Sequence, residues 1–534
     1  SPLDRSSAAS DVYKRQSYTK LAVGGAGGDG ADGGDVTVTH SGTITVRGDN
    51  AYGIFAQSVG GAGGNAGLSI STPVAMAADY VISTLLGART GTDGTAGTVT
   101  VNSTGDIVVL GANSQAILSQ SVNGGGGNVQ TFLDFTKTEA ASARALAAAP
   151  ETGPDVGVTS SLSLGGEDIS GSVGSDVTQV HRGDMLTTAA RSTGMLLQSV
   201  GGGGGTAVTD VKAGRTGDLS LNAMLGAVNT NDAGGGDITA RRNGTVETRG
   251  DMSAGGLTQS VGGGGGRLML NTGAGQAGSG QRSANVTLGA DPSFRNDGGD
   301  VSLRLRGAVA TRGDHASAQI VQSIGAGGGQ AMMAGLDRAR VTLGASDGST
   351  GDGGAIRLAN RGNVQTAGGG AHGFVLQSIG GGGGMVATDL RAGSLSVNLS
   401  DENGGDGGDI GFENRGYVLT AGRDAVGVLA QSLGGGGGAV DGLYRGSAGG
   451  AGSGGAIDMD LTGNILSLGR DGIAVMAQSA GRDGADSISV ALDGVIVGGS
   501  GAASGGVLSA RAPTRPAGST AGPAAIVVDG GTVN

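Results

Sequence analysis

A Gln-Ser pair recurs eight times in this sequence, and the residues before it keep a fixed spacing. A Gly stands fifteen residues before every Gln, and a Val or Ile stands six residues before that Gly, so each block holds 22 residues of constant length. Constant blocks separated by variable insertions are typical of proteins that stack one structural repeat on the next. The repeated glutamines are Gln57, Gln120, Gln198, Gln259, Gln322, Gln377, Gln431 and Gln478.

Each block has the pattern of three short strands separated by turns. Apolar and polar residues alternate with a period of two, as in residues 36–39 (VTVT) and 44–46 (ITV), which indicates half-buried strands. The turn before the third strand is rich in Gly, Asp and Asn, residues that readily adopt a backbone conformation with positive φ. Three short strands cannot bury their apolar face within one block, so neighbouring blocks must stack and cover each other. The sequence therefore predicts an all-β fold, a right-handed parallel β-helix (β-solenoid) of irregular glycine-rich repeats.

The third strand of each block ends in the Gln-Ser pair. Apolar residues stand two before and, with Ala in the last copy, two after each Gln. Because alternate residues of a strand share a face, we expect the Gln to point inward with its amide hydrogen-bonded, and the Ser to be structural. The insertions, of 25 to 56 residues, are expected to be loops and optional extra turns, with a short helix at residues 140–149.

Composition narrows the function classes. The 534 residues include 118 Gly, six Tyr and six Phe, but no Trp and no Cys, so a compact aromatic core and a large globular enzyme are not expected. The absence of Cys excludes disulfides and thiolate metal sites. The Gly tracts after Gln-Ser lack the Lys of a phosphate loop, so we expect no cofactor and no catalytic residue.

The charge pattern bears on partners. With 33 basic and 45 acidic residues the net charge is −12, and no basic block occurs along the chain. The cationic surface that nucleic-acid binding requires is therefore predicted to be missing, and nucleic acid is not expected as a partner.

Two acidic glycine runs resemble the start of a calcium-binding nonapeptide. They place Asp29 and Asp32 in GGDGAD, and Asp406 and Asp409 in GGDGGD. Calcium rolls need such nonapeptides in uninterrupted tandem, whereas here they occur once per unit. A polar Asp-Gly turn is the other interpretation. A Ca²⁺-dependent glycine-rich repeat protein stays open as an alternative function.

A β-helix enzyme acting on polysaccharides is a second alternative. It would need paired carboxylates on one face, about 5 to 10 Å apart. The chain has only six Glu, and no acid pair recurs outside the glycine turns. Four RGD strings invite an integrin interpretation. Three of them, at Arg47, Arg249 and Arg312, stand at the same turn of the block, where Gly and Asp are favoured for the backbone, and the fourth, at Arg182, contains the fixed Gly183.

The two ends differ from the repeats. Residues 1–16 share nothing with the blocks and are predicted to be a non-native or artefactual leader. Residues 17–481 are assigned to the solenoid with its eight repeats, and residues 482–534 to its degenerate, truncated end. Because a solenoid needs its last coils covered, we expect a fragment of something longer.

The block pattern G-x-I/V-x-T-x-G-x-x-A-x-G-I-L-x-Q-S-V/I-G-G-G-G-G resembles the repeat of glycine-rich passenger regions in autotransporters, the type V secreted surface proteins of Gram-negative bacteria. The resemblance covers about residues 24–481, and such passengers, which cross the periplasm unfolded, also usually lack Cys. It implies an extracellular, cell-surface parallel β-helix anchored in the outer membrane by the protein's own C-terminal β-barrel, which is not part of this sequence.

From the repeats and this resemblance we expect a non-enzymatic structural stalk or adhesin. Its partners would be polymers or proteins of a host, of the matrix or of neighbouring cells. Many weak contacts repeated along one rod would replace a single binding site.

Overall fold

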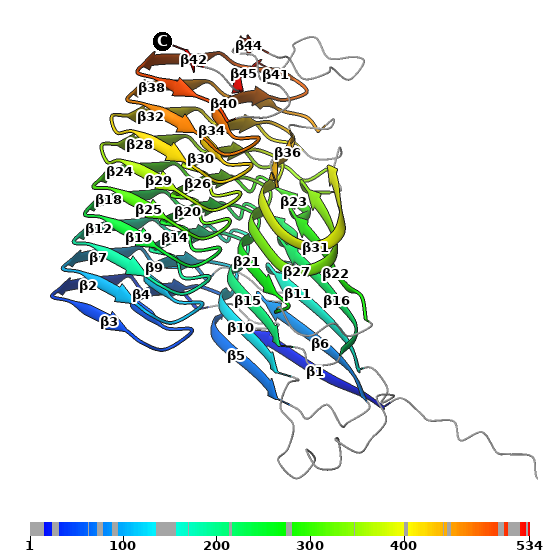
Figure 1. Ribbon diagram of the computed structural model, residues 1–534. Coiled ribbons are helices and arrows are strands. Elements are labelled where there is room, and N and C mark those ends of the chain that lie inside the picture. The colour runs from blue at the N-terminus through cyan, green and yellow to red at the C-terminus, as the bar shows by residue number, and fades with distance from the viewer. Residues whose placement is uncertain are drawn as a thin grey trace, which may run out of the picture.

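The chain folds as a stack of coils with a further sheet alongside it (Figure 1). In this computed structural model each coil gives one strand to each of three long sheets. The part of the chain that is described contains no α-helix, and hence none that could span a membrane. The described residues are 15–23, 31–61, 63–71, 78–87, 94–134, 156–168, 170–212, 216–273, 280–346, 348–399, 404–441, 443–445, 450–499, 507–510, 524–529 and 532–533.

The first sheet is formed by the strand that opens each block. Eight of its strands begin at the Val or Ile of the fixed spacing, and equivalent residues pair in parallel, as Val36 with Val99 and Val99 with Val177. The predicted all-β parallel solenoid is confirmed. The strands are β2 (Val36–Ser41), β7 (Val99–Thr104), β12 (Val177–Arg182), β18 (Ile238–Asn243), β24 (Val301–Arg306), β28 (Ile356–Asn360), β32 (Ile410–Asn414), β38 (Ile457–Thr462) and β42 (Ile488–Asp493).

The second sheet consists of short strands that begin two residues after the fixed Gly of each block. The strands are β3 (Ile44–Val46), β8 (Ile107–Val109), β13 (Met185–Thr187), β19 (Val246–Thr248), β25 (Val309–Thr311), β29 (Val364–Thr366), β33 (Val418–Thr420), β39 (Ile465–Ser467) and β43 (Ile496–Val497), with β46 (Thr532–Val533) antiparallel to β43. β42 and β43 carry the first two sheets one coil beyond the last Gln-Ser block, into residues 482–534.

The third sheet carries the Gln-Ser pairs. Equivalent glutamines are direct partners in its parallel register, as Gln198 with Gln259. The strands are β4 (Tyr52–Val59), β9 (Gln115–Val122), β14 (Met195–Val200), β20 (Gly256–Val261), β26 (Gln319–Ile324), β30 (Phe374–Ile379), β34 (Val426–Leu433) and β40 (Ile473–Ala480), followed by the antiparallel β45 (Ala524–Asp529) and β44 (Val507–Ala510).

The turn before the third strand repeats one backbone conformation. The residue seven before each Gln has φ between 54° and 61° in all eight blocks, as the turn composition predicts. A side chain disfavours this region by about 1–2 kcal/mol. Pairing between coils fixes it: the N–H of Met252 donates to the carbonyl of Asp314 at 2.7 Å. The residues are Asn50, Asn113, Arg191, Met252, His315, Gly370, Asp424 and Asp471.

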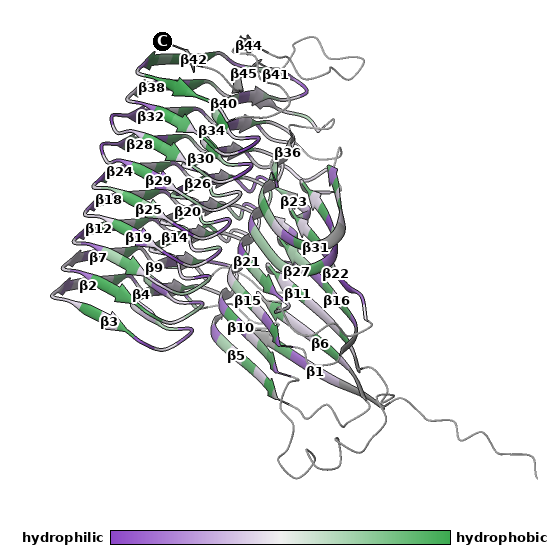
Figure 2. Ribbon diagram, in the orientation of Figure 1, coloured by the Kyte–Doolittle hydropathy of each residue, from purple (hydrophilic) through white to green (hydrophobic). Residues whose placement is uncertain are grey.

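One column of mainly aliphatic side chains fills the coils. Ile107 and Val109 of the second sheet and Ile117 of the third are fully buried there with the first-sheet valines. In Figure 2 the strands of the stack carry hydrophobic segments and many corners are hydrophilic. Burying one such side chain contributes about 1.5–3 kcal/mol. Because the neighbouring coils supply the contacts, the coils are stable as a stack.

The insertions between blocks contain strands, so the prediction of loops and optional turns is wrong for them. After the Gly tract the chain runs out along one strand and returns along another, and each pairs in parallel with equivalent insertions. We call the result the side sheet (Figure 1). Each insertion shows only a short alternating pattern, which becomes a sheet only beside its neighbours. The expected helix at residues 140–149 lies outside the described residues.

In β27 and β31 the outward and return passages join into one strand with register shifts. The outgoing strands are β5 (Gly64–Ser71), β10 (Gly126–Asp134), β15 (Gly204–Lys212), β21 (Gly265–Asn271) and β35 (Gly437–Val440). The returning strands are β1 (Arg15–Val23), β6 (Ala78–Leu86), β11 (Val156–Leu164), β16 (Thr216–Leu225) and β22 (Arg282–Leu288). The joined strands are β27 (Gly328–Leu343) and β31 (Gly383–Leu399). β36 (Leu443–Arg445) is antiparallel to β35. Two small sheets pair β17 (Val228–Asn231) with β23 (Asp291–Phe294), and β37 (Ser453–Gly454) with β41 (Gly484–Ala485).

The side sheet has its own hydrophobic core. Leu133 and Leu270 of the outgoing strands pack in the same cluster as Ile82 and Leu221 of the returning strands. Among the described residues, the two largest hydrophobic clusters therefore lie inside the coils and within the side sheet.

Candidate functional site

The eight repeat glutamines form one hydrogen-bonded column. The Nε2 of each Gln donates to the Oε1 of the Gln in the next coil, at 2.7 to 2.9 Å, from Gln57 through to Gln478. Four of them also donate to the carbonyl of a Gly seven residues later, at 3.2 to 3.4 Å. Seven are buried, and Gln57 in the first coil is half-buried. The amides have the hydrogen bonds that the sequence analysis expects.

The glutamines face the side sheet and not the interior of the coils. The neighbours of Gln198 at one and three residues before it, Leu197 and Met195, pack in the coil core. Leu196 and Val200 share the face of Gln198 and belong to separate clusters outside that core. The shared face with apolar residues is confirmed, but the inward direction is wrong, because the side sheet covers the outer face of the third sheet.

The serine after each glutamine bridges two coils. The hydroxyl of Ser260 donates to the carbonyl of Gly236 at 2.8 Å and accepts the N–H of Gly299 in the next coil at 2.8 Å. Five equivalent serines make the same pair of bonds, which supports a structural role: Ser58, Ser199, Ser323, Ser378 and Ser432.

The aspartates at the coil corners bind backbone N–H groups of the next coil. Asp32 accepts from the N–H and the hydroxyl of Thr95, at 2.8 and 3.0 Å. Asp406 and Asp409 accept from next-coil N–H groups at 2.6 and 2.9 Å. Of the calcium candidates, Asp29 lies outside the described residues. Within the described ranges no group of three His, Asp or Glu residues could hold a metal ion.

The aspartates of the four RGD strings are hydrogen-bonded at coil corners. Asp49, Asp184, Asp251 and Asp314 each accept a backbone N–H from the next coil, at 2.7 to 3.0 Å. One carboxylate oxygen of each string is therefore engaged within the protein. The turn interpretation explains why Gly and Asp recur at this place.

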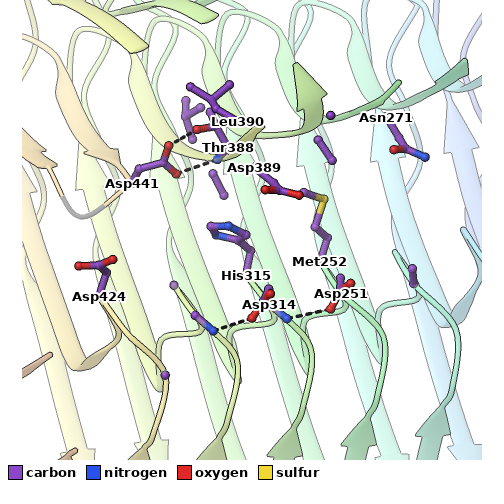
Figure 3. A pocket seen from close by; sticks show the side chains of 18 of the residues that line it. Asp251, Met252, Asn271, Asp314, His315, Thr388, Asp389, Leu390, Asp424 and Asp441 are labelled. Atoms are coloured by element: carbon purple, nitrogen blue, oxygen red, sulfur yellow. Dashed lines mark hydrogen bonds between the residues drawn. The ribbon is translucent and has the colours of Figure 1, made fainter. Parts of the chain in front are cut away.

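A groove of about 850 Å³ runs between these turns and the side sheet (Figure 3). Met252 and His315, both in the positive-φ position of the turn, line one wall, and Asp389 and Thr388 of β31 line the other. Asp441 lies beside Thr388 and also lines the groove. The groove was not visible in the sequence, because its second wall is made by the insertions.

Most carboxylates of the groove have partners in the protein. Asp441 accepts from the N–H of Thr388 at 2.7 Å and from its hydroxyl, and burial raises the pKa of Asp441. Asp424 pairs with Arg423 at 3.0 Å. Among the described lining carboxylates, Asp389 alone has neither a hydrogen bond nor an ion pair. A glycosidase would need two carboxyl groups free to act on substrate.

A buried histidine lies beside the groove. Burial, and to a smaller degree the electrostatic interaction with nearby His315, lower the pKa of His372 to about 4. The Nδ1 of His372 accepts the N–H of Val426 at 3.0 Å, which requires the neutral ring. This histidine is therefore a neutral structural acceptor at pH 7.

Exposed arginines gather on the outer face of the first sheet. Arg241 and Arg304, which are 63 residues apart in sequence, are direct partners on β18 and β24. The inference that the chain has no cationic surface is therefore wrong, because stacking collects charges that are scattered along the sequence. The expectation that nucleic acid is no partner stays a prediction.

Comparison of this chain with protein-family models and with curated proteins found no match.

Proposed function

We propose that this chain is a rigid, non-enzymatic stalk or adhesive segment of a bacterial surface protein, of the autotransporter passenger type. The observation that carries the proposal is the unbroken side-chain column from Gln57 to Gln478, with the coil core beside it. Such a column stiffens the stack along its axis. Nine strands in the first sheet, at about 4.8 Å per step, give roughly 38 Å of reach.

The way the coils hold together suits a segment that folds after export. Each coil pairs only with the coil before it and the coil after it, so folding can begin at one coil and spread. The chain has no Cys, so nothing would be crosslinked in an oxidising compartment on the way. The amides of the glutamine column and the corner aspartates have hydrogen-bond partners within the protein itself.

The corner chemistry favours this proposal over the Ca²⁺-dependent alternative. Asp32, Asp406 and Asp409 already use carboxylate oxygens to hold the next coil. The second alternative, an enzyme acting on polysaccharides, would have to use the groove. There Asp441 and Asp424 are engaged by Thr388 and Arg423.

The first test is refolding. Residues 17–534 are unfolded in urea, diluted into buffer with EDTA and followed by far-UV circular dichroism. We expect full return of the β signal. A chain that stays unfolded until Ca²⁺ is added would overturn the proposal in favour of the calcium alternative.

The second test is display. The chain is fused to the translocating anchor of a known autotransporter in a Gram-negative host, and intact cells are treated with protease. We expect a protease-resistant surface core and stronger attachment of these cells to coated surfaces than of cells carrying the anchor alone. Retention of the chain inside the cell, or display without rigidity or attachment, would contradict the proposed role.

A further inference from the structure

Charge is unevenly distributed on the solvent-facing side of the first sheet. In the coils of β12, β18, β24 and β28 the outward positions hold six exposed arginines and no acidic residue. Two coils further on, the outward positions of β38 hold Asp458 and Asp460. We call the basic part the arginine face. Its residues are Arg182, Arg241, Arg304, Arg306, Arg357 and Arg361.

These guanidinium groups are largely free to bind a partner. Within the described ranges, only Arg357 of the six lies within ion-pair distance of a carboxylate, 3.9 Å from Asp300. The corner aspartates that border the face, Asp184, Asp237 and Asp300, each use one carboxylate oxygen to accept a backbone N–H from the next coil, at 2.7 to 2.8 Å.

The arginine face is hollowed along the axis of the stack. A depression of about 260 Å³ is lined by Arg182, Arg241, Arg304 and Arg306. A second, of about 430 Å³, shares Arg304 and continues past Arg357, and its far end is lined by Glu413, Asp458 and Asp460, where the basic part ends. The two form a shallow trough. Neighbouring strands are about 4.8 Å apart, so arginines recur along the trough at intervals of one or two strands.

A buried cation lies behind the same strands. Arg241 and Arg242 are consecutive residues of β18, so their side chains lie on opposite faces of the first sheet. Arg241 is exposed, whereas Arg242 is buried without a hydrogen-bond partner in the described structure. Burial lowers the pKa of Arg242 only to about 10, so it stays charged at pH 7. Its charge adds to the positive potential of the face.

We propose that the arginine face binds a linear acidic polysaccharide, whose carboxylate or sulfate groups follow the trough along the stack. The planar guanidinium matches both groups through paired N–H donors. Each exposed contact is weak by itself, so a polymer that meets several arginines at once gains affinity through multivalency.

Two observations favour a polysaccharide over a nucleic acid. The outward positions of these four coils contain no aromatic side chain on which bases could stack. With a net charge of −12, the rest of the chain carries −18 once the six arginines are set aside. That charge repels a duplex with one charge per about 1.7 Å more strongly than a polymer with one charge per sugar.

The test measures binding of the purified full chain to three probes: polygalacturonate, with one carboxylate per sugar, neutral dextran, and single-stranded DNA. We expect salt-sensitive binding of polygalacturonate, none of dextran, and weaker binding of DNA. The variant R241Q/R304Q/R306Q should bind polygalacturonate roughly tenfold more weakly. Absence of wild-type binding at low salt, or tighter binding of DNA, would overturn the proposal.

A matched control removes three positive charges elsewhere. Arg249 and Arg312 pair with Glu247, and Arg423 with Asp424, all outside the arginine face. R249Q/R312Q/R423Q should change the affinity less than about twofold. An equal loss in both triple variants would show that only net charge matters and would refute the site.

A second variant, R182Q/R361Q, covers the case in which the first triple variant misfolds by circular dichroism. It should also weaken binding of polygalacturonate, and unchanged affinity would count against the trough. The inference rests on the proposed function only for the location, the cell surface, at which the chain would encounter the polysaccharide. Binding is measured with purified protein, so a failure to bind polygalacturonate would not contradict the proposed function. A failure of surface display would likewise not contradict the binding result.

Discussion

Replacing one glutamine in the middle of the column should destabilise the stack far more than replacing the first one. Met is the chosen replacement, because it is unbranched, has a similar volume and cannot hydrogen-bond as an amide does. In Gln259→Met three bonds are lost: the donation from Gln198, the donation to Gln322, and the donation to the carbonyl of Gly266.

The expected cost follows from counting these bonds. Each is worth about 1 kcal/mol net, and the buried Oε1 of Gln322 is left without its donor, which adds about 1 kcal/mol or more. We expect Gln259→Met to lower the free energy of unfolding by about 4 kcal/mol. Gln57→Met loses one bond, to Gln120, whose Oε1 still accepts from Asn128 at 3.3 Å. Its expected cost is about 1 kcal/mol.

The assay combines urea unfolding with native-state hydrogen exchange. Hydrogen exchange reports on individual coils, which matters because a long stack need not unfold in one step. The amides of β20 and its two neighbouring strands should lose protection in Gln259→Met, and those of β4 should change little in Gln57→Met. Equal effects of the two substitutions, or a cost below about 1 kcal/mol for Gln259→Met, would refute the view that the column stabilises the stack.

Three further predictions concern close packing, pH and calcium. A Cβ on Gly205 (φ +123°) would lie 2.1 Å from the carbonyl oxygen of Gly127, whereas one on Gly411 has no neighbour nearer than 3.9 Å. Gly205→Ala should therefore lower the unfolding midpoint clearly and Gly411→Ala hardly at all, and equal midpoints would contradict this. Because the folded-state pKa of His372 is about 4, below the ordinary 6.5, its contribution is complete above pH 6.5 and is lost as the pH falls towards 4, by up to about 3 kcal/mol. Urea unfolding across this pH range should show that His372→Gln loses less stability towards pH 4 than the wild-type protein does. An unchanged pH profile would contradict this role of His372. Far-UV circular dichroism and the thermal midpoint should be the same in EDTA and in Ca²⁺, and a large rise of the midpoint with Ca²⁺ would show that the corner aspartates bind the ion.

The strands of the block could be predicted almost to the residue, because fixed spacing and period-two alternation both report on the same local geometry. Strand β2 begins at Val36 and β3 at Ile44, as the pattern indicates. The direction of the glutamines could not be predicted. Alternation tells which residues share a face, but both faces of the third sheet are buried, so it does not tell which core a face meets.

The side sheet and the arginine face were not predicted from the sequence, for a different reason. The partners of each strand of the side sheet lie in other insertions, at varying distances along the chain. Arg241 and Arg304 likewise become neighbours only through the register of the stack. Equivalent block residues pair whatever the length of the insertion between them, so the adjacency of these arginines follows from the block spacing, whereas the pairing within the insertions does not.

The glutamine column has a direction. In all seven bonds the amide nitrogen belongs to the earlier coil and the oxygen to the later one, so the amide dipoles add along the stack, and aligned hydrogen bonds polarise one another. An amide turned the other way would set nitrogen against nitrogen on one side and oxygen against oxygen on the other. Whichever coil orders first thus fixes the orientation of every amide that joins it, and the column forms with one polarity from end to end.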